Sequence, residues 1–115
     1  MKTRAKIEFG DFQTPVELAH EVCALLVRQA VEVDVVVEPT CGIGAFLVAA
    51  AEAFPKARLH GWDINHSYVE QTENALADAG ARKRATIGQQ DFFSHNWEKK
   101  LSEIPGRLLI LDNLP

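Results

Sequence analysis

Four acidic residues, Glu38, Asp63, Asp91 and Asp112, each stand at the end of an apolar, strand-like run. In an open sheet of parallel strands, ligands bind beyond the carboxyl ends of the strands, where the strand order reverses. Carboxylates at that edge accept hydrogen bonds from hydroxyl and amino groups and attract cations. The spacing therefore predicts one ligand-binding site at the edge of a parallel sheet.

A glycine turn follows the first of these runs, in the stretch EPTCGIGAFL. Gly42 and Gly44 allow the backbone to turn tightly and to approach a ligand closely, and the helix that follows offers unpaired N–H groups. Asp63 comes about 20 residues later, where an acidic residue accepts hydrogen bonds from ribose hydroxyls. The pattern favours a cofactor that contains adenosine.

Local features distinguish NAD from S-adenosylmethionine, since both can fill such a site. In a dinucleotide-binding fingerprint the strand runs almost directly into the glycines. Here Glu38 and Pro39 intervene, and Leu47 occupies the position of the third glycine. A carboxylate at Glu38 repels a pyrophosphate and attracts the ammonium group of an amino acid moiety. The loop therefore favours S-adenosylmethionine.

Apolar periodicity predicts the elements that position these residues. Thr14 is expected to be the N-cap of the first helix, with Pro15 at the first helical position and Glu17 completing a capping box. Ser94 is expected to cap the last short helix. The apolar face of the first helix is expected at Val16, Ala19, Val22, Cys23, Leu26, Val27 and Ala30. Further helices are expected over 45–54, 67–80 and 94–104, and strands over 33–39, 57–64, 82–92 and 106–115.

Strands that alternate with helices predict an α/β fold, a Rossmann-like doubly wound parallel sheet of about four strands with flanking helices. Residues 33–39 are apolar on consecutive positions, as in a strand buried on both faces. The 115 residues form a single domain. Nothing follows the last strand to cover its edge, so we expect self-association, a partner chain or a longer protein of which this is the front part.

Composition excludes several classes of function. The formal net charge of −4 gives no global positive field for binding a phosphate backbone. Cys23 and Cys41 stand at no zinc-like spacing to the four histidines, so no metal is expected. No run approaches the roughly 18 apolar residues that span a bilayer. We therefore expect a cytoplasmic protein without a membrane contact.

Four short motifs carry a resemblance to a known family. EPTCGIGAFL, GWDIN, QQDFF and DNLP, in this order and spacing, resemble motifs I to IV of class I S-adenosylmethionine-dependent methyltransferases. The resemblance is closest to the N6-adenine DNA methyltransferases of restriction–modification systems. GDFQTP resembles the segment that these enzymes place ahead of motif I. The resemblance implies an incomplete class I methyltransferase fold, with S-adenosylmethionine as cofactor and DNA contacted through regions outside this chain.

The resemblance also implies roles for single residues. The methionine end of the cofactor is assigned to Phe12, Thr14 and Pro15, and the loop under the methionine and ribose to Glu38, Thr40, Gly42 and Gly44. The ribose hydroxyls are assigned to Asp63, packing on the adenine to Ile64, and the adenine amino edge and face to Asp91 and Phe92.

The implied catalytic motif comprises Asp112, Asn113 and Pro115. The side chain of Asn113 and the next carbonyl group accept hydrogen bonds from the target amino group of a flipped base. Leu114 departs from the family, which has a proline there, and the aromatic residue that follows in the family is absent from these 115 residues. We expect weak cofactor binding and no methyl transfer by this chain alone, because catalysis of this kind rests on positioning.

Other functions remain open at this point. The same motif serves the methylation of adenine in RNA or of a glutamine amide in a protein. A methyltransferase-like subunit that is not catalytic and scaffolds a partner is an alternative of a different class, and Leu114 is consistent with it. A dinucleotide-dependent oxidoreductase is a third.

Overall fold

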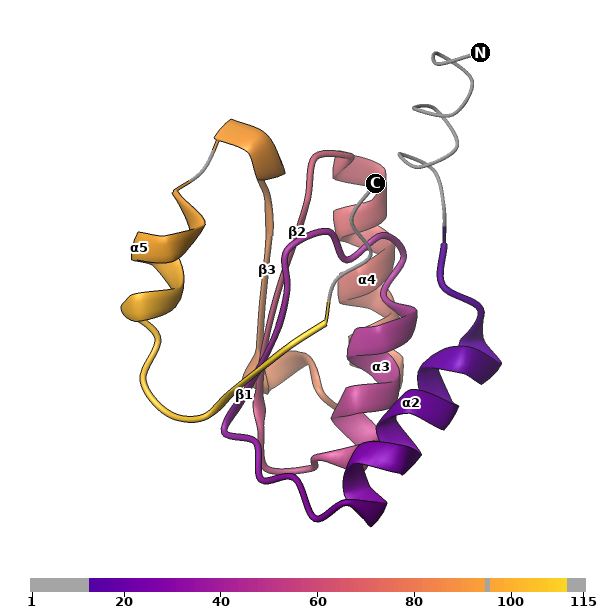
Figure 1. Ribbon diagram of the computed structural model, residues 1–115. Coiled ribbons are helices and arrows are strands. Elements are labelled where there is room, and N and C mark those ends of the chain that lie inside the picture. Colours follow the sequence, from indigo (N-terminus) through magenta and orange to yellow (C-terminus); the bar gives the residue numbers. More distant parts are fainter. Residues whose placement is uncertain (1–12, 95, 112–115) are drawn as a thin grey trace, which may run out of the picture.

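A computed structural model describes residues 13–94 and 96–111 of the chain (Figure 1). These residues form a parallel four-stranded sheet in the order β3-β2-β1-β4. The strands are β1 (Val35–Glu38), β2 (Arg58–Asp63), β3 (Ala85–Gln89) and β4 (Leu108–Ile110). The predicted fold class is confirmed. The order reverses between β1 and β4, and the crevice at the carboxyl end of β1 is where such sheets bind ligands.

Strand β1 is buried along its whole length, as the consecutive β-branched residues predicted. Val36 pairs with Leu59 of β2 on one side and with Leu109 of β4 on the other. Val36 packs in the core on one face of the sheet, and Val35 and Val37 pack in a cluster on the other face, so β1 lacks the alternation of an amphipathic strand. The burial fixes the end of β1, and with it Glu38, firmly within the fold.

Three helices, α2 (Val16–Arg28), α3 (Ala45–Ala53) and α4 (His66–Asp78), cover one face of the sheet, whereas α5 (Trp97–Ser102) lies on the other face (Figure 1). Short 3-10 helices stand at Arg82–Arg84 and Phe92–Ser94. Leu47, Leu59 and Leu76 are fully buried in the core beneath the three helices. No helix within the described ranges is long and apolar enough to cross a membrane.

A second apolar cluster lies between the sheet and α5. Val35, Val37 and Trp62 are buried there, and Trp97 of α5 meets Trp62 edge to face, with ring centroids 5.2 Å apart. Lys100 places its ammonium group 5.2 Å from the centroid of the Trp62 ring. The aromatic side chains therefore attach α5, although it has only six residues.

Two predicted helix caps are wrong. Pro15 is the N-cap of α2, no side chain caps this end, and the Pro15 carbonyl accepts the first helical hydrogen bond from Ala19 N. Asn96 caps α5, because its Oδ1 accepts a hydrogen bond of 3.1 Å from Lys99 N. Ser94 ends a preceding 3-10 helix and donates its hydroxyl to the Asp91 carbonyl. Ser94 and Asn96 are similar in capping ability, so the path of the incoming chain decides which of them caps α5.

The buried face of α2 is narrower than its apolar pattern predicted. Ala19 and Cys23 are buried, whereas the side chains of Val16 and Val27 are 57% and 49% exposed. Ala30 lies beyond the end of the helix, with φ of 58°. Helix α2 packs against the alanine-rich α3, and contact with a single helix covers only a narrow stripe.

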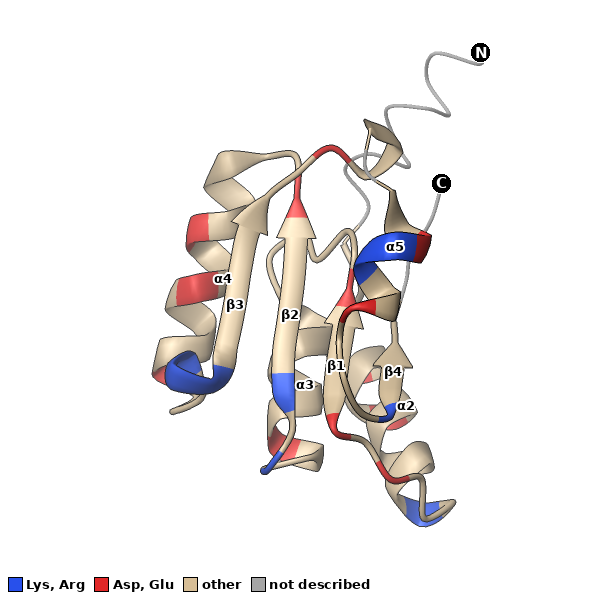
Figure 2. Cartoon of the chain, turned by 90° about the vertical axis from the view of Figure 1, so that its left-hand side faces the viewer, with Lys and Arg blue, Asp and Glu red and all other residues tan. Residues whose placement is uncertain are grey.

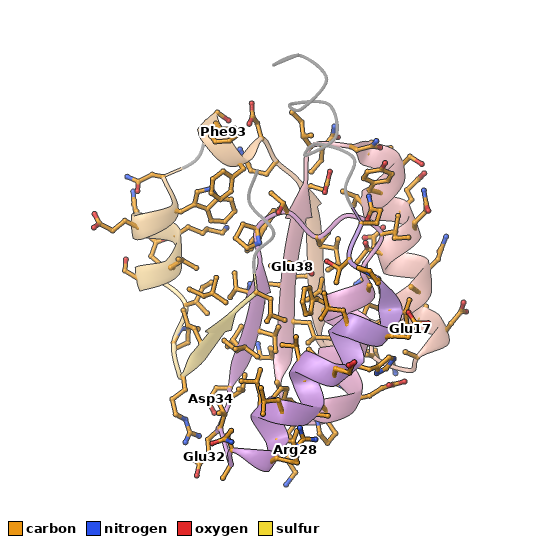
Figure 3. All side chains as sticks on the ribbon, turned by 45° about the vertical axis from the view of Figure 1, so that its right-hand side comes forward. Glu17, Arg28, Glu32, Asp34, Glu38 and Phe93 are labelled. Atoms are coloured by element: carbon orange, nitrogen blue, oxygen red, sulfur yellow. The ribbon has the colours of Figure 1, made fainter. Side chains whose placement is uncertain are left out.

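An ion pair joins the beginnings of β1 and β4, at the end of the sheet opposite Glu38 (Figure 3). Asp34 accepts hydrogen bonds from Arg107 N at 2.7 Å and from Arg107 Nε at 2.9 Å, and Glu32 also pairs with Arg107. The side-chain hydrogen bond from Arg107 lowers the pKa of Asp34 from 3.8 to about 2. This pair joins the two neighbouring strands at the end of the sheet away from Glu38.

Candidate cofactor site

A small pocket opens at the carboxyl end of β1. Glu38, the last residue of β1, is 2% exposed, and Figure 3 shows it where β1 passes into the loop before α3. The pocket is lined by Gln13, Thr14, Glu38, Thr40, Cys41, Gly42, Ala45 and Phe46. The structure therefore brings together the predicted residues Thr14, Glu38, Thr40 and Gly42. Pro15, which is exposed, follows them directly as the N-cap of α2.

The loop between β1 and α3, residues 39–44, is called the glycine loop, and both of its glycines have a backbone conformation that other residues disfavour. Gly42 and Gly44 have φ angles of +56° and +93°, in the left-handed region that side chains disfavour. Gly44 is the N-cap of α3, and its N–H donates to the Cys41 carbonyl at 3.0 Å. Cys41 N donates to the Trp62 carbonyl at 2.7 Å, which fastens the start of the loop to β2.

Asp63 holds the glycine loop against the end of β2. Its Oδ2 accepts a hydrogen bond of 2.9 Å from Gly42 N, and its Oδ1 accepts one of 2.9 Å from Asn65 N. A carboxylate has about four acceptor positions, so both oxygens can still accept from ligand hydroxyls. Asp63, which the sequence predicts to bind ribose, therefore joins the loop after β1 to the loop after β2.

Sequence reasoning missed two residues of this site. Gln13 Oε1 accepts a hydrogen bond of 3.0 Å from Ile43 N. Thr72, fully buried in α4, donates its hydroxyl to the Gly42 carbonyl at 2.8 Å. A signal for Thr72 was present, because this polar residue stands between Val69 and Leu76 at core-facing positions of α4. Gln13 gave no signal besides its place beside Thr14.

The residues assigned to the adenine lie on the next loops along the same edge. Ile64, directly after β2, is 61% exposed, and Asp91, after β3, is exposed and accepts a hydrogen bond of 3.0 Å from Phe93 N. Phe92 stacks on Trp97 at a centroid distance of 5.4 Å. Phe93 is 78% exposed at the tip of this loop (Figure 3). Trp97 of α5 therefore covers one face of the Phe92 ring.

Four residues of the predicted site fall outside the described residues, Phe12, Asp112, Asn113 and Pro115, and so does Leu114 between the last two. The described part of the chain ends at Leu111, whose N–H donates to the Val37 carbonyl at 2.9 Å. This bond continues the pairing of β4 with β1 to within one residue of Glu38. The described chain therefore reaches the carboxyl edge of the sheet beside the pocket.

Acidic residues end the two central strands, whereas Glu32 and Asp34 at the opposite end of the sheet are paired with Arg107. Figure 2 shows acidic residues at the ends of β1 and β2 and basic residues at the beginning of β2 and before β3. No lysine or arginine is among the described residues that line the pocket. Such an edge attracts a cationic ligand and disfavours a polyanionic one.

Cys41 contributes no nucleophile to the pocket. Its side chain is 4% exposed, and burial raises the pKa of the thiol to about 12. Only the thiolate is reactive, so Cys41 is inert at neutral pH. Across residues 13–94 and 96–111, no group of three or more His, Cys, Asp or Glu side chains is placed to hold a metal ion.

Solved structures define the class of fold. The O-methyltransferase TomG from Streptomyces achromogenes, in complex with S-adenosylmethionine, matches 87% of this chain and 45% of its own with a TM-score of 0.66 and 18% sequence identity. At this identity the likeness concerns the fold alone. The fold is the Rossmann-like fold of class I methyltransferases.

Sequence comparison finds relatives of one kind, type II methyltransferases. The type II methyltransferase M.NspV from Nostoc sp. is 39% identical over 113 residues, which are 97% of this chain and 23% of the relative. The type II methyltransferase M.VspI from Vibrio sp. is 28% identical over 90 residues, 77% of this chain and 22% of the relative. The chain thus spans less than a quarter of the length of either relative. No protein-family model matches it.

The resemblance found in the motifs is therefore confirmed. The chain resembles class I S-adenosylmethionine-dependent methyltransferases in fold and type II restriction–modification methyltransferases in sequence.

Proposed function

We propose that this chain is the cofactor-binding part of a cytoplasmic S-adenosylmethionine-dependent DNA methyltransferase that acts on the N6 amino group of adenine. The observation that carries the proposal is the acidic pocket under the glycine loop at the carboxyl end of β1, where the strand order reverses. The names of the two curated relatives support a restriction–modification enzyme.

The residues of the pocket fit S-adenosylmethionine by charge and by their hydrogen-bonding groups. This cofactor has a sulfonium centre and an ammonium group, both cationic, and the buried Glu38 carboxylate complements them. The hydroxyls of Thr14 and Thr40 line the same pocket and can donate to the carboxylate of the methionine moiety. The missing Cβ of Gly42 leaves room for the side chain of Gln13, which also lines the pocket.

The neighbouring loops complete the cofactor site in this proposal. Asp63 accepts hydrogen bonds from the ribose hydroxyls with the acceptor positions that Gly42 N and Asn65 N leave open. Ile64 packs on the adenine, and Asp91 accepts from its amino group. Because Phe92 stacks on Trp97, it contributes an edge or a single face to the adenine wall.

The catalytic part of the proposal concerns Asp112, Asn113 and Pro115, which lie outside the described residues. When bound, the cofactor supplies the activated methyl group. Asn113 accepts a hydrogen bond from the target amino group, together with the carbonyl of the next residue, and so orients the nitrogen lone pair. DNA is held by regions outside this chain, consistent with the net charge of −4.

Calorimetric titration tests the cofactor. We expect heat on addition of S-adenosylhomocysteine and none with NAD, and we expect Glu38→Gln to weaken S-adenosylhomocysteine binding about tenfold through loss of the charge. Glu21→Gln, at an exposed position of α2, is the matched control and should bind like the wild type. Heat with NAD alone, or an unchanged affinity in a folded Glu38→Gln variant, contradicts the proposal.

Methyl transfer tests the substrate. In a protein that contains this chain with its remaining sequence, adenine-containing DNA should accept the methyl group and Asn113→Ala should abolish the transfer. RNA oligonucleotides and a glutamine-containing peptide, assayed in parallel, distinguish the other substrates of the same motif. Full transfer by Asn113→Ala, or transfer to RNA or peptide only, would refute the assignment.

We also propose that the free edge of β4 pairs with another strand. Among the described strands β4 pairs only with β1, and Ile110 is 46% exposed. An exposed apolar edge offers unpaired N–H and C=O groups to a further strand, from the remaining sequence of a longer protein, from a partner or from a second copy. Sedimentation of the chain should show association that increases with concentration and decreases when Ile110 is replaced by lysine. A monomer at all concentrations contradicts pairing between copies.

A further inference from the structure

We propose that Thr72 and Gln13 are positioning residues for cofactor binding: from two separate segments, they hold the glycine loop in the conformation that binds the cofactor. The proposal rests on the proposed cofactor site and adds two residues to it. Thr72 lies outside the motifs that carry the family resemblance. Gln13 lies inside GDFQTP, but the resemblance assigns it no role.

Thr72 holds the loop from the side of the core. Its hydroxyl donates to the Gly42 carbonyl at 2.8 Å, and the side chain is completely buried. A Cβ built on Gly44 would lie 3.1 Å from both Cγ2 and Oγ1 of Thr72, so the threonine packs directly behind the loop. Thr72 therefore cannot reach a ligand in the pocket and acts only through the loop.

Gln13 holds the loop from the side of the chain segment that precedes α2. Its Oε1 accepts a hydrogen bond of 3.0 Å from Ile43 N, and its side chain fills the space where a Cβ of residue 42 would be. An amide nitrogen cannot accept this bond, so the bond fixes the orientation of the amide. The bond links the pocket residues before α2 to the loop after β1.

The third contact is made by Asp63, which accepts from Gly42 N at 2.9 Å. Three polar backbone groups of the loop, Gly42 N, Gly42 O and Ile43 N, are thus bound by side chains from three separate segments. A loop with its backbone groups bound in this way has fewer conformations to lose when a ligand arrives. The affinity for the cofactor should then depend on these distant side chains.

Two substitutions of Thr72 distinguish the contribution of its hydroxyl from the contribution of its methyl group to packing. Thr72→Val keeps the shape and removes the hydroxyl, which leaves the Gly42 carbonyl without this donor. Thr72→Ser keeps the hydroxyl and removes the methyl group that lies behind Gly44. If Thr72 only fills space, the serine variant is the more damaging, whereas the valine variant is the more damaging if the hydrogen bond positions the loop.

The experiment measures the binding of S-adenosylhomocysteine by calorimetry and the exchange of the loop amides by NMR. We expect Thr72→Val and Gln13→Leu each to raise the Kd about tenfold, and Thr72→Ser to stay within about threefold of the wild type. Thr86→Val, at an exposed position of β3, is the matched control. The amides of Gly42 and Ile43 should exchange faster in Thr72→Val than in the control, while the amide of Val36 in the core should not.

The outcomes separate this proposal from the proposed function. Wild-type affinity in Thr72→Val, or weaker binding by Thr72→Ser than by Thr72→Val, overturns the positioning role. Failure of the wild type itself to bind S-adenosylhomocysteine refutes the cofactor assignment. In that case hydrogen exchange still decides on the loop, because unchanged exchange of Gly42 and Ile43 in Thr72→Val shows that the hydroxyl does not hold it.

Discussion

Replacement of Gly42 by alanine tests the contact between the glycine loop and Gln13, and Gly80→Ala serves as the reference for the cost of backbone strain alone. Both glycines have positive φ, +56° at Gly42 and +76° at Gly80. An added Cβ at Gly80 meets nothing within 4 Å, whereas at Gly42 it would lie 2.3 Å from Oε1 of Gln13. The two substitutions therefore share the backbone strain, and only Gly42→Ala displaces a neighbour.

The magnitude follows from these contacts. A side chain in the left-handed region costs about 1–2 kcal/mol, and the smaller entropy of the unfolded alanine chain offsets part of it, so Gly80→Ala should cost about 1 kcal/mol of unfolding free energy. Gly42→Ala also moves Gln13 away from Ile43 N and loses that hydrogen bond, which adds about 1 kcal/mol. We expect a total of roughly 2 kcal/mol for Gly42→Ala.

Urea unfolding followed by tryptophan fluorescence measures both variants, because Trp62 is 8% exposed in the folded protein. The midpoint should fall without a change in the slope of the transition. In a Gln13→Ala background the extra cost should vanish, and Gly42→Ala should then cost no more than Gly80→Ala does. Equal costs for the two single substitutions, or strict additivity with Gln13→Ala, would refute the contact between Gln13 and the loop.

Three further predictions concern other parts of the fold. The lowered pKa of Asp34 means that its bond to Arg107 contributes stability above about pH 4, and that this stability is lost as the pH falls from 3.8 to about 2. Asp34→Asn should therefore lose less stability than the wild type over this pH range. Identical acid unfolding transitions of the two proteins contradict this prediction. Because burial raises the pKa of the Cys41 thiol to about 12, iodoacetamide at pH 8 should label this residue only when the protein is unfolded in urea. Mass spectrometry of the peptide that contains Cys41 measures the labelling, and labelling of the folded protein contradicts the burial. Asn96→Ala should cost about 1 kcal/mol in urea unfolding through loss of the α5 cap while Ser94→Ala costs less, and the reverse order contradicts the assignment of the cap.

Most of the fold could be predicted because it follows from local patterns. Consecutive apolar residues over 35–37 predict a strand that is buried on both sides, and the strand proves to be central in the sheet. Gly42 and Gly44 predict a tight turn, and both have positive φ. Alternation of strands and helices predicts the parallel order, because the crossover rule leaves few topologies.

The errors in α2 concern one end and one face of this helix, which the tertiary surroundings decide. Thr14 is as good a helix cap as any, yet α2 begins one residue later and no side chain caps it. Val16 and Val27 satisfy the helical period but stay exposed, because α2 meets α3 along a narrow line. Propensity and periodicity do not contain the position of the partner helix, so they cannot decide such cases.

By itself the sequence determined which residues stand at the strand ends and which loop can turn tightly, since both depend on residues close together in the chain. Only the tertiary structure decided how that loop is held. Thr72 and Gln13 each contact it across 30 residues of sequence. Such contacts arise when α4 and the segment before α2 pack on the same edge of the sheet, and the free energy that places them there comes from the burial of the whole core.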